Sequence, residues 1–463
     1  MVRIASRIII VGLIISGCQV GPKYHQPEVS VVNAWKNTQA TDALPHVECW
    51  WEIFQDQNLT NLIEQAIQNN PSLLAASERV ELARDFAKVS KSRLFPQLNF
   101  DPAASNTLQR SHSIGSTASP PPTLIQNHID EYLLPLTLLY EFDFWGKWRN
   151  QYRSALFKAE AEMEGYRTSI LLLTTDLANA YFQLRIEDAQ IELFKQILST
   201  RKTALDIQQS RFDAKLINYT DVTTYQTDYS IVESEYYDAL KNRALFENQI
   251  AVLLGVSPST FKLDPTPLKE LPPEIPAGVP AKILLRRPDL AEEERKMAAI
   301  HAEINVAYAS YFPSIDLSGV LNFLSNDFHK TSTFLWSIGS NLTEILFDAG
   351  GRSSNIEAFT AKFHAAAATY QDKVITAFQE VEDSLASLHW IANEMKAIDT
   401  SLSAAQIAFQ IALDRYQFGL SSYLGAANHE RTALNQEMAY LRLLKARYLH
   451  TVHLIKAIGG GWE

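Results

Sequence analysis

A 30-residue stretch occurs twice in this chain, and the duplication constrains the fold more than any other feature. Residues 71–100, PSLLAASERVELARDFAKVSKSRLFPQLNF, align without a gap with residues 288–317, PDLAEEERKMAAIHAEINVAYASYFPSIDL. The identical pairs are Pro71/Pro288, Leu73/Leu290, Val89/Val306, Phe95/Phe312 and Pro96/Pro313. Self-similarity of this kind indicates a repeated architecture. We therefore predict two similar halves, repeat 1 over residues 71–257 and repeat 2 over residues 288–458.

The first 17 residues are predicted to be a signal peptide that is absent from the mature protein. Arg3 and Arg7 form a basic start, residues 8–15 form a short apolar core, and Ser16-Gly17-Cys18 follows. This pattern resembles the bacterial lipoprotein signal, in which the cysteine becomes the lipidated N-terminus. An ordinary signal peptide with an incidental Cys18 is the alternative. Gln at position 19, in place of Asp, favours sorting to the outer membrane of a Gram-negative cell.

The charge of the mature chain argues against a nucleic-acid partner. Loss of Arg3 and Arg7 moves the formal net charge from −11 to −13, and an acidic chain binds the phosphate backbone poorly. With Cys18 acylated, Cys49 has no second cysteine to pair with. Its neighbours Trp50 and Trp51 predict a packing role for Cys49.

Alternation of apolar and polar residues predicts two strands in each half. In repeat 2 they are expected at about 314–323 and 334–343, and in repeat 1 at roughly 97–108 and 130–142. One face of the second strand of repeat 1 is formed by Tyr132, Leu134, Leu136, Leu138, Tyr140 and Phe142. Each strand pair ends at a corner that contains glycine, FDFWGK in repeat 1 and FDAGGR in repeat 2.

After each corner the chain is predicted to be almost entirely helical. Residues 147–257 contain no proline, nor do residues 352–458, and both stretches are rich in good helix formers. Each stretch breaks once, at 211–219 and at 415–423, which we interpret as the tips of two helical hairpins. The first arm, of about 64 residues, would be roughly 95 Å long at 1.5 Å per residue, too long for a compact domain.

The remaining segments connect or end the repeats. Residues 18–70 are expected to be irregular at first and then to form a short amphipathic helix over 59–67. Residues 258–287 form a proline-rich linker, and residues 459–463 form a glycine-rich C-terminal tail.

Four amphipathic strands are too few to cross a membrane within one chain. An open sheet in lipid would leave the N–H and C=O groups of its edges unpaired, and the smallest membrane barrels have about eight strands. We therefore expect the strands to be pooled between chains, and the long helices with them. A soluble sheet packed on a helical bundle is the alternative.

Several motifs, taken in order, resemble the TolC-like outer-membrane efflux factors, in their acylated OprM/NodT-type branch. The motifs are CQVGPKYHQP at 18–27, WWEIF at 50–54, IPAGVP at 275–280, RRPDL at 286–290, FDAGGR at 347–352 and AIGGGW at 457–462. The resemblance implies a mainly α protein with transmembrane β-strands. It implies a homotrimer whose 12-stranded outer-membrane β-barrel is continuous with a 12-helix periplasmic α-barrel, around a mixed equatorial domain.

The resemblance also implies a function and a set of site residues. The protein would be the exit duct of a tripartite efflux pump, with a periplasmic membrane-fusion adaptor and an inner-membrane transporter of the RND type as partners. The adaptor would dock at the hairpin tips, on Ala214, Lys215 and Leu216 and on Phe418, Gly419 and Leu420. Lys215 stands where the family usually has glycine. Asp221 and Tyr416 match residues that close the periplasmic gate.

No enzymatic motif is present, and no cofactor or metal is expected. The chain lacks a phosphate-binding glycine loop, Gly-x-Ser-x-Gly and His-Glu-x-x-His. His450 and His453 could share a metal, but ordinary surface histidines are the favoured interpretation. Alternatives to the efflux duct are the outer-membrane duct of a type I protein secretion system and a lipid-anchored coiled-coil scaffold.

Overall fold

The computed structural model describes residues 20–27, 34–36, 49–112, 124–268, 270–276, 286–325 and 333–460. Cys18 and the predicted signal peptide lie outside these residues. The chain divides into two compact units, unit 1 (Met1–Pro27, Glu81–Ala161 and Glu294–Ala368) and unit 2 (Glu28–Val80, Glu162–Glu293 and Thr369–Glu463). Each unit draws on both repeats, because long helices of repeat 1 and of repeat 2 contribute residues to both units.

The helices confirm the duplication. Repeat 1 contains α3 (Pro71–Ser92), α4 (Lys147–Asp213) and α5 (Tyr219–Leu253), and repeat 2 contains α7 (Pro288–Ala309), α8 (Gly351–Gln417) and α9 (Tyr423–Ala457). The matching helices have equal lengths of 22, 67 and 35 residues. The predicted hairpins are therefore confirmed. No helix in the described part of the chain is both long and apolar enough to cross a membrane.

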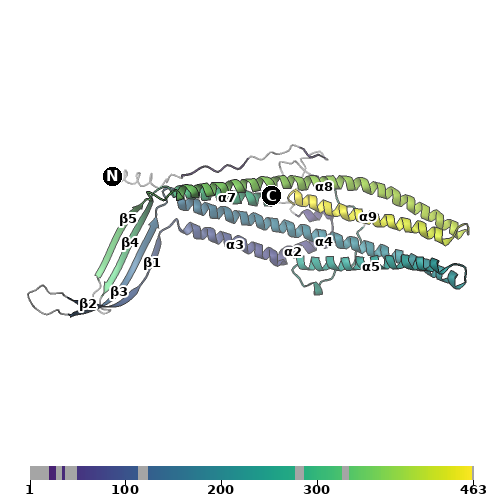
Figure 1. Ribbon diagram of the computed structural model, residues 1–463, viewed down its shortest axis with the longest axis horizontal. Helices are drawn as coiled ribbons and strands as arrows, with labels where there is room; N and C mark the ends of the chain where they lie inside the picture. Colours follow the sequence, from purple (N-terminus) through teal and green to yellow (C-terminus); the bar gives the residue numbers. More distant parts are fainter. Residues whose placement is uncertain are drawn as a thin grey trace, which may run out of the picture. The chain divides into compact units, whose positions relative to one another are not determined.

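Unit 1 contains one antiparallel sheet in the order β1-β3-β4-β5, with β2 also paired to β3 (Figure 1). The strands are β1 (Gln97–Phe100), β2 (Ala103–His112), β3 (Leu124–Glu141), β4 (Ser314–Ser325) and β5 (Thr333–Thr343). The two predicted strand pairs thus meet through β3 and β4. This leaves β1 and β2 on one edge of the sheet and β5 on the other.

The prediction of a single first strand over 97–108 is corrected in detail. That strand is interrupted between β1 and β2, although both parts pair with β3 in one continuous register, Phe100 opposite Leu136 and Ala103 opposite Leu133. Pro102 and Pro135 lie at the interruption, and neither has an N–H to donate to the ladder. Since β3 begins at Leu124, the hairpin is also longer than expected.

The register gathers the predicted apolar residues on one face of the sheet. Cross-strand rows are Leu134, Phe323 and Phe334, then Leu136, Leu321 and Trp336, then Leu138, Gly319 and Ile338. Several of these side chains are exposed, with Trp336 at 67% and Ile338 at 81%. A contiguous exposed apolar face marks a surface that meets lipid or another protein.

An aspartate at each corner fixes the start of the following helix in unit 1. Asp143 accepts from the backbone N–H groups of Trp148 (3.1 Å) and Arg149 (2.9 Å), and Asp348 accepts from that of Arg352 (3.0 Å). An arginine closes each turn, because Arg149 Nε and Arg352 Nε also donate to Asp143 and Asp348. These bonds supply acceptors for helix N–H groups that have no partner within the helix.

Unit 2 is held together by a core to which α2 (Gln57–Asn69) and the long helices contribute. Its largest fully buried side chains include Leu59, Tyr181, Ile250 and Leu444. Cys49 packs at the margin of this core, as predicted. The 3-10 helix η1 (Trp50–Phe54) adds an aromatic group in which Phe54 lies 4.8 Å from Phe182 between ring centroids.

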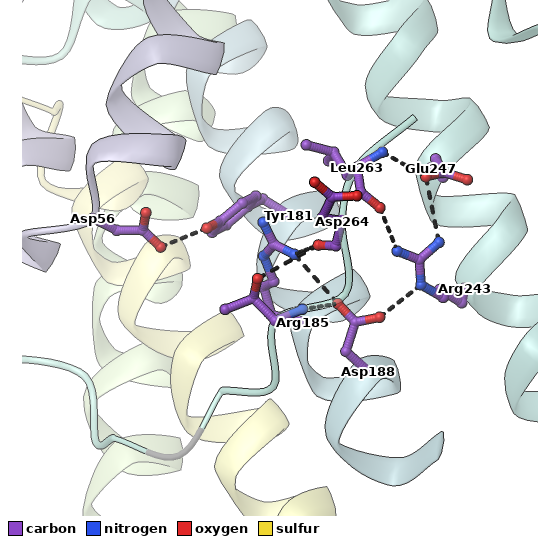
Figure 2. Close-up of polar contacts among 9 residues, drawn as sticks. Asp56, Tyr181, Arg185, Asp188, Arg243, Glu247, Leu263 and Asp264 are labelled. Atoms are coloured by element: carbon purple, nitrogen blue, oxygen red, sulfur yellow. Dashed lines mark hydrogen bonds and ion pairs between the residues drawn. The ribbon is translucent and has the colours of Figure 1, made fainter. Parts of the chain in front are cut away.

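A buried polar network fastens the proline-rich linker to the helices of unit 2 (Figure 2). Asp188 on α4 is 4% exposed and contacts both Arg185 (3.3 Å) and Arg243 (2.6 Å). The two arginines also donate to linker carbonyl oxygens, Arg185 to Asp264 (2.6 Å) and Arg243 to Leu263 (2.7 Å). These hydrogen bonds join the linker to α4 and α5. No sequence motif indicates that these residues contact one another.

Candidate docking and gate site at the hairpin tips

The two hairpin tips, both in unit 2, have the same backbone conformation. At the end of α4, Leu216 N–H bonds to Arg211 C=O (2.9 Å) and Lys215 N–H to Phe212 C=O (2.8 Å). At the end of α8 the same two bonds are made by Leu420 to Arg415 (2.8 Å) and by Gly419 to Tyr416 (2.9 Å). This pattern is the Schellman motif, in which the residue after the helix adopts a left-handed conformation. Lys215 accordingly has φ 58° and Gly419 φ 71°.

The tips expose large apolar side chains. Leu216 is 70% exposed, Phe418 79% and Leu420 71%. A β-carbon added at Gly419 would meet no atom within 4 Å, so open space surrounds this backbone position. Apolar side chains this exposed at the ends of long helices favour a binding surface for another protein. Lys215, which stands where glycine is usual, therefore leaves the backbone conformation of the first tip the same as that of the second.

Separate substitutions at the two left-handed positions, Lys215 and Gly419, should change the stability of their tips in opposite directions. A left-handed non-glycine residue costs about 1–2 kcal/mol, while a new glycine costs about 0.4–1 kcal/mol of chain entropy. We expect Lys215→Gly to stabilise its tip by about 0.5–1 kcal/mol and Gly419→Ala to destabilise its own by about 1 kcal/mol. Amide hydrogen exchange at the helix ends measures both. If both substitutions stabilised their tips, or both destabilised them, the left-handed conformation would not be what determines tip stability.

The proposed gate residues lie near the tips but on different hairpins. Tyr416 lies at the end of α8, where its ring packs edge-on against Tyr423, with centroids 5.3 Å apart. The equivalent pair in the first hairpin is Phe212 and Tyr219, also at 5.3 Å. The ring of Tyr416 therefore serves a packing role that both hairpins share, and its hydroxyl group is the distinctive feature.

Asp221 lies in the first turn of α5, where its side chain is exposed. Within the described part of one chain, no hydrogen bond joins the Asp221 carboxylate to the Tyr416 hydroxyl group. A gate contact between Asp221 and Tyr416 is therefore a proposal that concerns an assembly of several chains.

A charged cluster close to the tips was not predicted from the sequence. Arg201 on α4 is only 6% exposed, and the charges of Asp228 on α5 and Glu430 on α9 act on it. Thr200 Oγ1 donates to Glu430 (2.9 Å), and Arg431 lies 3.6 Å from Asp228. The cluster thus links the two hairpins within the chain.

Burial controls the protonation behaviour of this cluster. Burial lowers the pKa of Arg201, against the opposing effect of Asp228 and Glu430. Burial also raises the pKa of Tyr423, and the negative charge of Glu430 adds to that rise. The sequence could have predicted that Arg201 is buried, because it lies at helical spacing from Ile197, Ala204 and Leu205, which are buried on the same face of α4. An arginine at such a position requires partners on neighbouring helices.

No cluster resembling a metal centre is found among the described residues. His450 and His453 are 6.0 Å apart between ring centroids and line a polar cavity with Asp176 and Lys456. Burial lowers the pKa of both imidazole groups.

Comparison with known proteins places these features in context. The chain matches the family described as "Outer membrane efflux protein" over residues 62–256 and 279–460. It is 28% identical to "Solvent efflux pump outer membrane protein SrpC" of Pseudomonas putida, over 97% of each chain. It is 26% identical to "Cation efflux system protein CusC" of Escherichia coli O6:H1, over 98% of each chain. Its fold is similar to that of the outer-membrane channel OprN, with a TM-score of 0.86, 26% identity and coverage of 96% of this chain and 100% of that one.

Proposed function

The chain belongs to the outer membrane efflux protein family, and on that premise we propose that three copies form the exit duct of a tripartite pump. It is an outer-membrane channel component of a Gram-negative efflux system and not an enzyme. The proposal concerns the assembly, the anchor, the gate and the docking partners.

The sheet of unit 1 carries the trimer proposal. Its apolar face exposes Trp336 and Ile338, and its two edges, β1 with β2 and β5, have no partner strand among the described residues. Neither edge can remain open in lipid. Because the strands alternate in direction, β5 of one copy can pair with β1 and β2 of the next in the same antiparallel manner. Three copies give a 12-stranded barrel, and their long helices give a 12-helix tunnel.

The exposed tip residues support docking of a periplasmic adaptor. Leu216, Phe418 and Leu420 offer apolar surface that the chain itself leaves uncovered. The adaptor would connect the duct to an inner-membrane transporter of the RND type. The names of the relatives refer to different cargoes, solvents for SrpC and cations for CusC, so we assign no cargo from them.

Conductance in a planar bilayer tests the duct. We expect the mature trimer to form channels whose open probability rises when the gate is weakened by Tyr416→Phe together with Asp221→Ala. Phe212 occupies the position equivalent to Tyr416, so Tyr416→Phe preserves the ring packing and removes only the hydroxyl group. Tyr219→Phe in the first hairpin is the control. A folded trimer that never conducts, with or without these changes, would overturn the proposal.

Lipid attachment is tested separately at Cys18. We expect Cys18→Ala to abolish incorporation of radioactive palmitate, because the thiol is the acceptor in the proposed modification. Cys49→Ala should retain full incorporation. Labelling that persists in the Cys18→Ala variant would rule out the anchor without affecting the channel proposal.

A further inference from the structure

A cavity of about 310 Å³ lies in unit 1 where the sheet meets the helices, and no role assigned above uses it. Its walls include Arg93, Trp148, Glu141 and Asp316, together with the apolar side chains of Leu139 and Phe95. Glu141 and Asp316 are cross-strand partners, as are Leu139 and Ser318, which also lines the cavity. Leu139, Glu141, Asp316 and Ser318 belong to the face of the sheet opposite Leu138, and the cross-strand pair Tyr140 and Leu317 of the apolar face completes the lining. In the proposed duct, the face that carries Glu141 and Asp316 lines the lumen.

Two donors at the wall of this cavity, the exposed guanidinium group of Arg93 and the buried indole N–H of Trp148, have no acceptor among the described residues. Among the described residues, Arg93 forms no ion pair, and its guanidinium group lies over the ring of Trp148 at 4.9 Å. The indole N–H of Trp148 is buried and has no hydrogen-bond partner in the described structure. A buried donor left unpaired is costly. A guanidinium group beside an unpaired N–H is suited to a carboxylate or a phosphate.

The acidic wall is only half neutralised. Glu141 and Asp316 lie directly opposite each other, an arrangement that is destabilising for like charges. Lys147 pairs with Glu141 at 2.9 Å, whereas Asp316 forms no ion pair with any described residue and accepts a hydrogen bond from the Ser314 hydroxyl group at 3.3 Å. The cavity therefore presents one cation, Arg93, and one carboxylate, Asp316, that do not form an ion pair with each other.

Repeat 2 lacks this arrangement. The position equivalent to Arg93 holds Ser310, and the position equivalent to Lys147 in the aligned corners holds Arg352. The arginine at the second corner, Arg352, is instead bonded to Glu344 (3.0 Å) and Asp348 (2.9 Å). The duplicated fold thus does not require the unpaired Arg93, which argues for a role specific to repeat 1.

We propose that this cavity is a lumenal subsite for small zwitterionic organic molecules that pass through the duct. The anionic group of the ligand binds Arg93 and the Trp148 N–H, its ammonium group faces Asp316, and its apolar part lies against Leu139 and Phe95. The inference rests on the proposed duct only for the statement that the cavity faces the lumen. A volume of about 310 Å³ is at the lower end of the range usual for small-molecule sites.

Binding of three matched probes to the purified full-length trimer tests the subsite. Phenylalanine carries both charges, 3-phenylpropionate lacks the ammonium group, and phenethylamine lacks the carboxylate. Saturation-transfer NMR titration should rank phenylalanine first. Arg93→Gln should weaken phenylalanine binding about tenfold, the usual effect of losing a charge-assisted hydrogen bond, and Trp148→Phe should weaken it several-fold. Arg84→Gln, on helix α3 that directly precedes Arg93 and paired with Glu81, is the control.

Each outcome decides the proposal. Asp316→Asn should remove the preference for phenylalanine over 3-phenylpropionate, and equal binding of the two probes to the wild type would overturn the role of Asp316. Equal binding of phenethylamine, or unchanged binding in Arg93→Gln, would overturn the site. Bilayer conductance of the same variants separates the two proposals, because a conducting variant that has lost the probe leaves the duct intact.

Discussion

Replacement of Asp188 by alanine is expected to destabilise the protein by about 3–5 kcal/mol, the usual effect of removing one member of a buried ion pair. Arg185 is 3% exposed and Asp188 4% exposed, so water cannot replace the lost carboxylate. The same carboxylate accepts from the linker N–H of Thr266 at 3.0 Å. The substitution therefore leaves Arg185 without its ionic partner and also releases the linker.

Asp238→Ala on α5 is the matched control. Its carboxylate pairs with Lys241 on the protein surface, where both side chains are more than half exposed, and exposed pairs contribute about 0–1 kcal/mol. Thermal unfolding of the trimer in detergent should separate the two variants clearly, and hydrogen exchange should increase at residues 258–268 in Asp188→Ala alone. Similar melting temperatures for both variants would show that the network is not essential for stability.

Gly419→Trp is expected to weaken docking of the adaptor about 30-fold while the trimer still assembles. A β-carbon at Gly419 meets no atom within 4 Å, so the cost of the substitution within the chain is the strain of a side chain at φ 71°. The indole will cover the exposed surface between Phe418 and Leu420. A loss of about 2 kcal/mol, typical of a disrupted interface centre, corresponds to an affinity roughly 30-fold lower. Cross-linking to the adaptor and drug export should both fall strongly, as expected for an affinity roughly 30-fold lower.

Gly419→Ala separates the bulk of the side chain from its effect on the backbone. Alanine imposes the same left-handed strain as tryptophan but adds only one methyl group. We expect it to retain cross-linking and export, at the small cost in tip stability described above. If alanine and tryptophan impair export equally, the defect arises from the backbone of the tip and not from blocked docking.

The duplicated helices were predictable because their signals are local. Absence of proline over more than 100 residues, helix-forming composition and two glycine-containing corners together predict the 67- and 35-residue arms. The strand faces were predictable for the same reason, since alternation is read directly from neighbouring residues. The break at Pro102 was missed because Pro135, which falls opposite the neighbouring Asp101 in the register, comes close to it only after the strands pair.

Contacts between distant segments could not be predicted. The linker bonds to Asp188 and Arg243 join residues on separate helices and depend on how these helices pack. Trp145 in the first corner donates its indole N–H to Pro313 (2.9 Å) and stacks on Phe312 at 4.5 Å. The Phe-Pro pair that marks the duplication therefore contacts the opposite repeat, a relation that a comparison of the two copies does not reveal. At the tips, the proposed docking residues came from family resemblance, whereas Arg201 required the structure.

The pairing of β3 with β4 has a consequence for the time course of folding. Glu141 lies opposite Asp316, so this contact joins residues 175 positions apart (316 minus 141) and encloses the whole first helical hairpin and the linker. Closure of such a long loop carries a large entropic cost and slows folding, whereas helices form within microseconds. We expect both helical hairpins to appear early in folding and the sheet to form last. After that step each chain still carries the unpaired edges of the described sheet, β1 with β2 and β5, until the copies assemble. Such edges are prone to aggregation, which favours a late, membrane-coupled assembly.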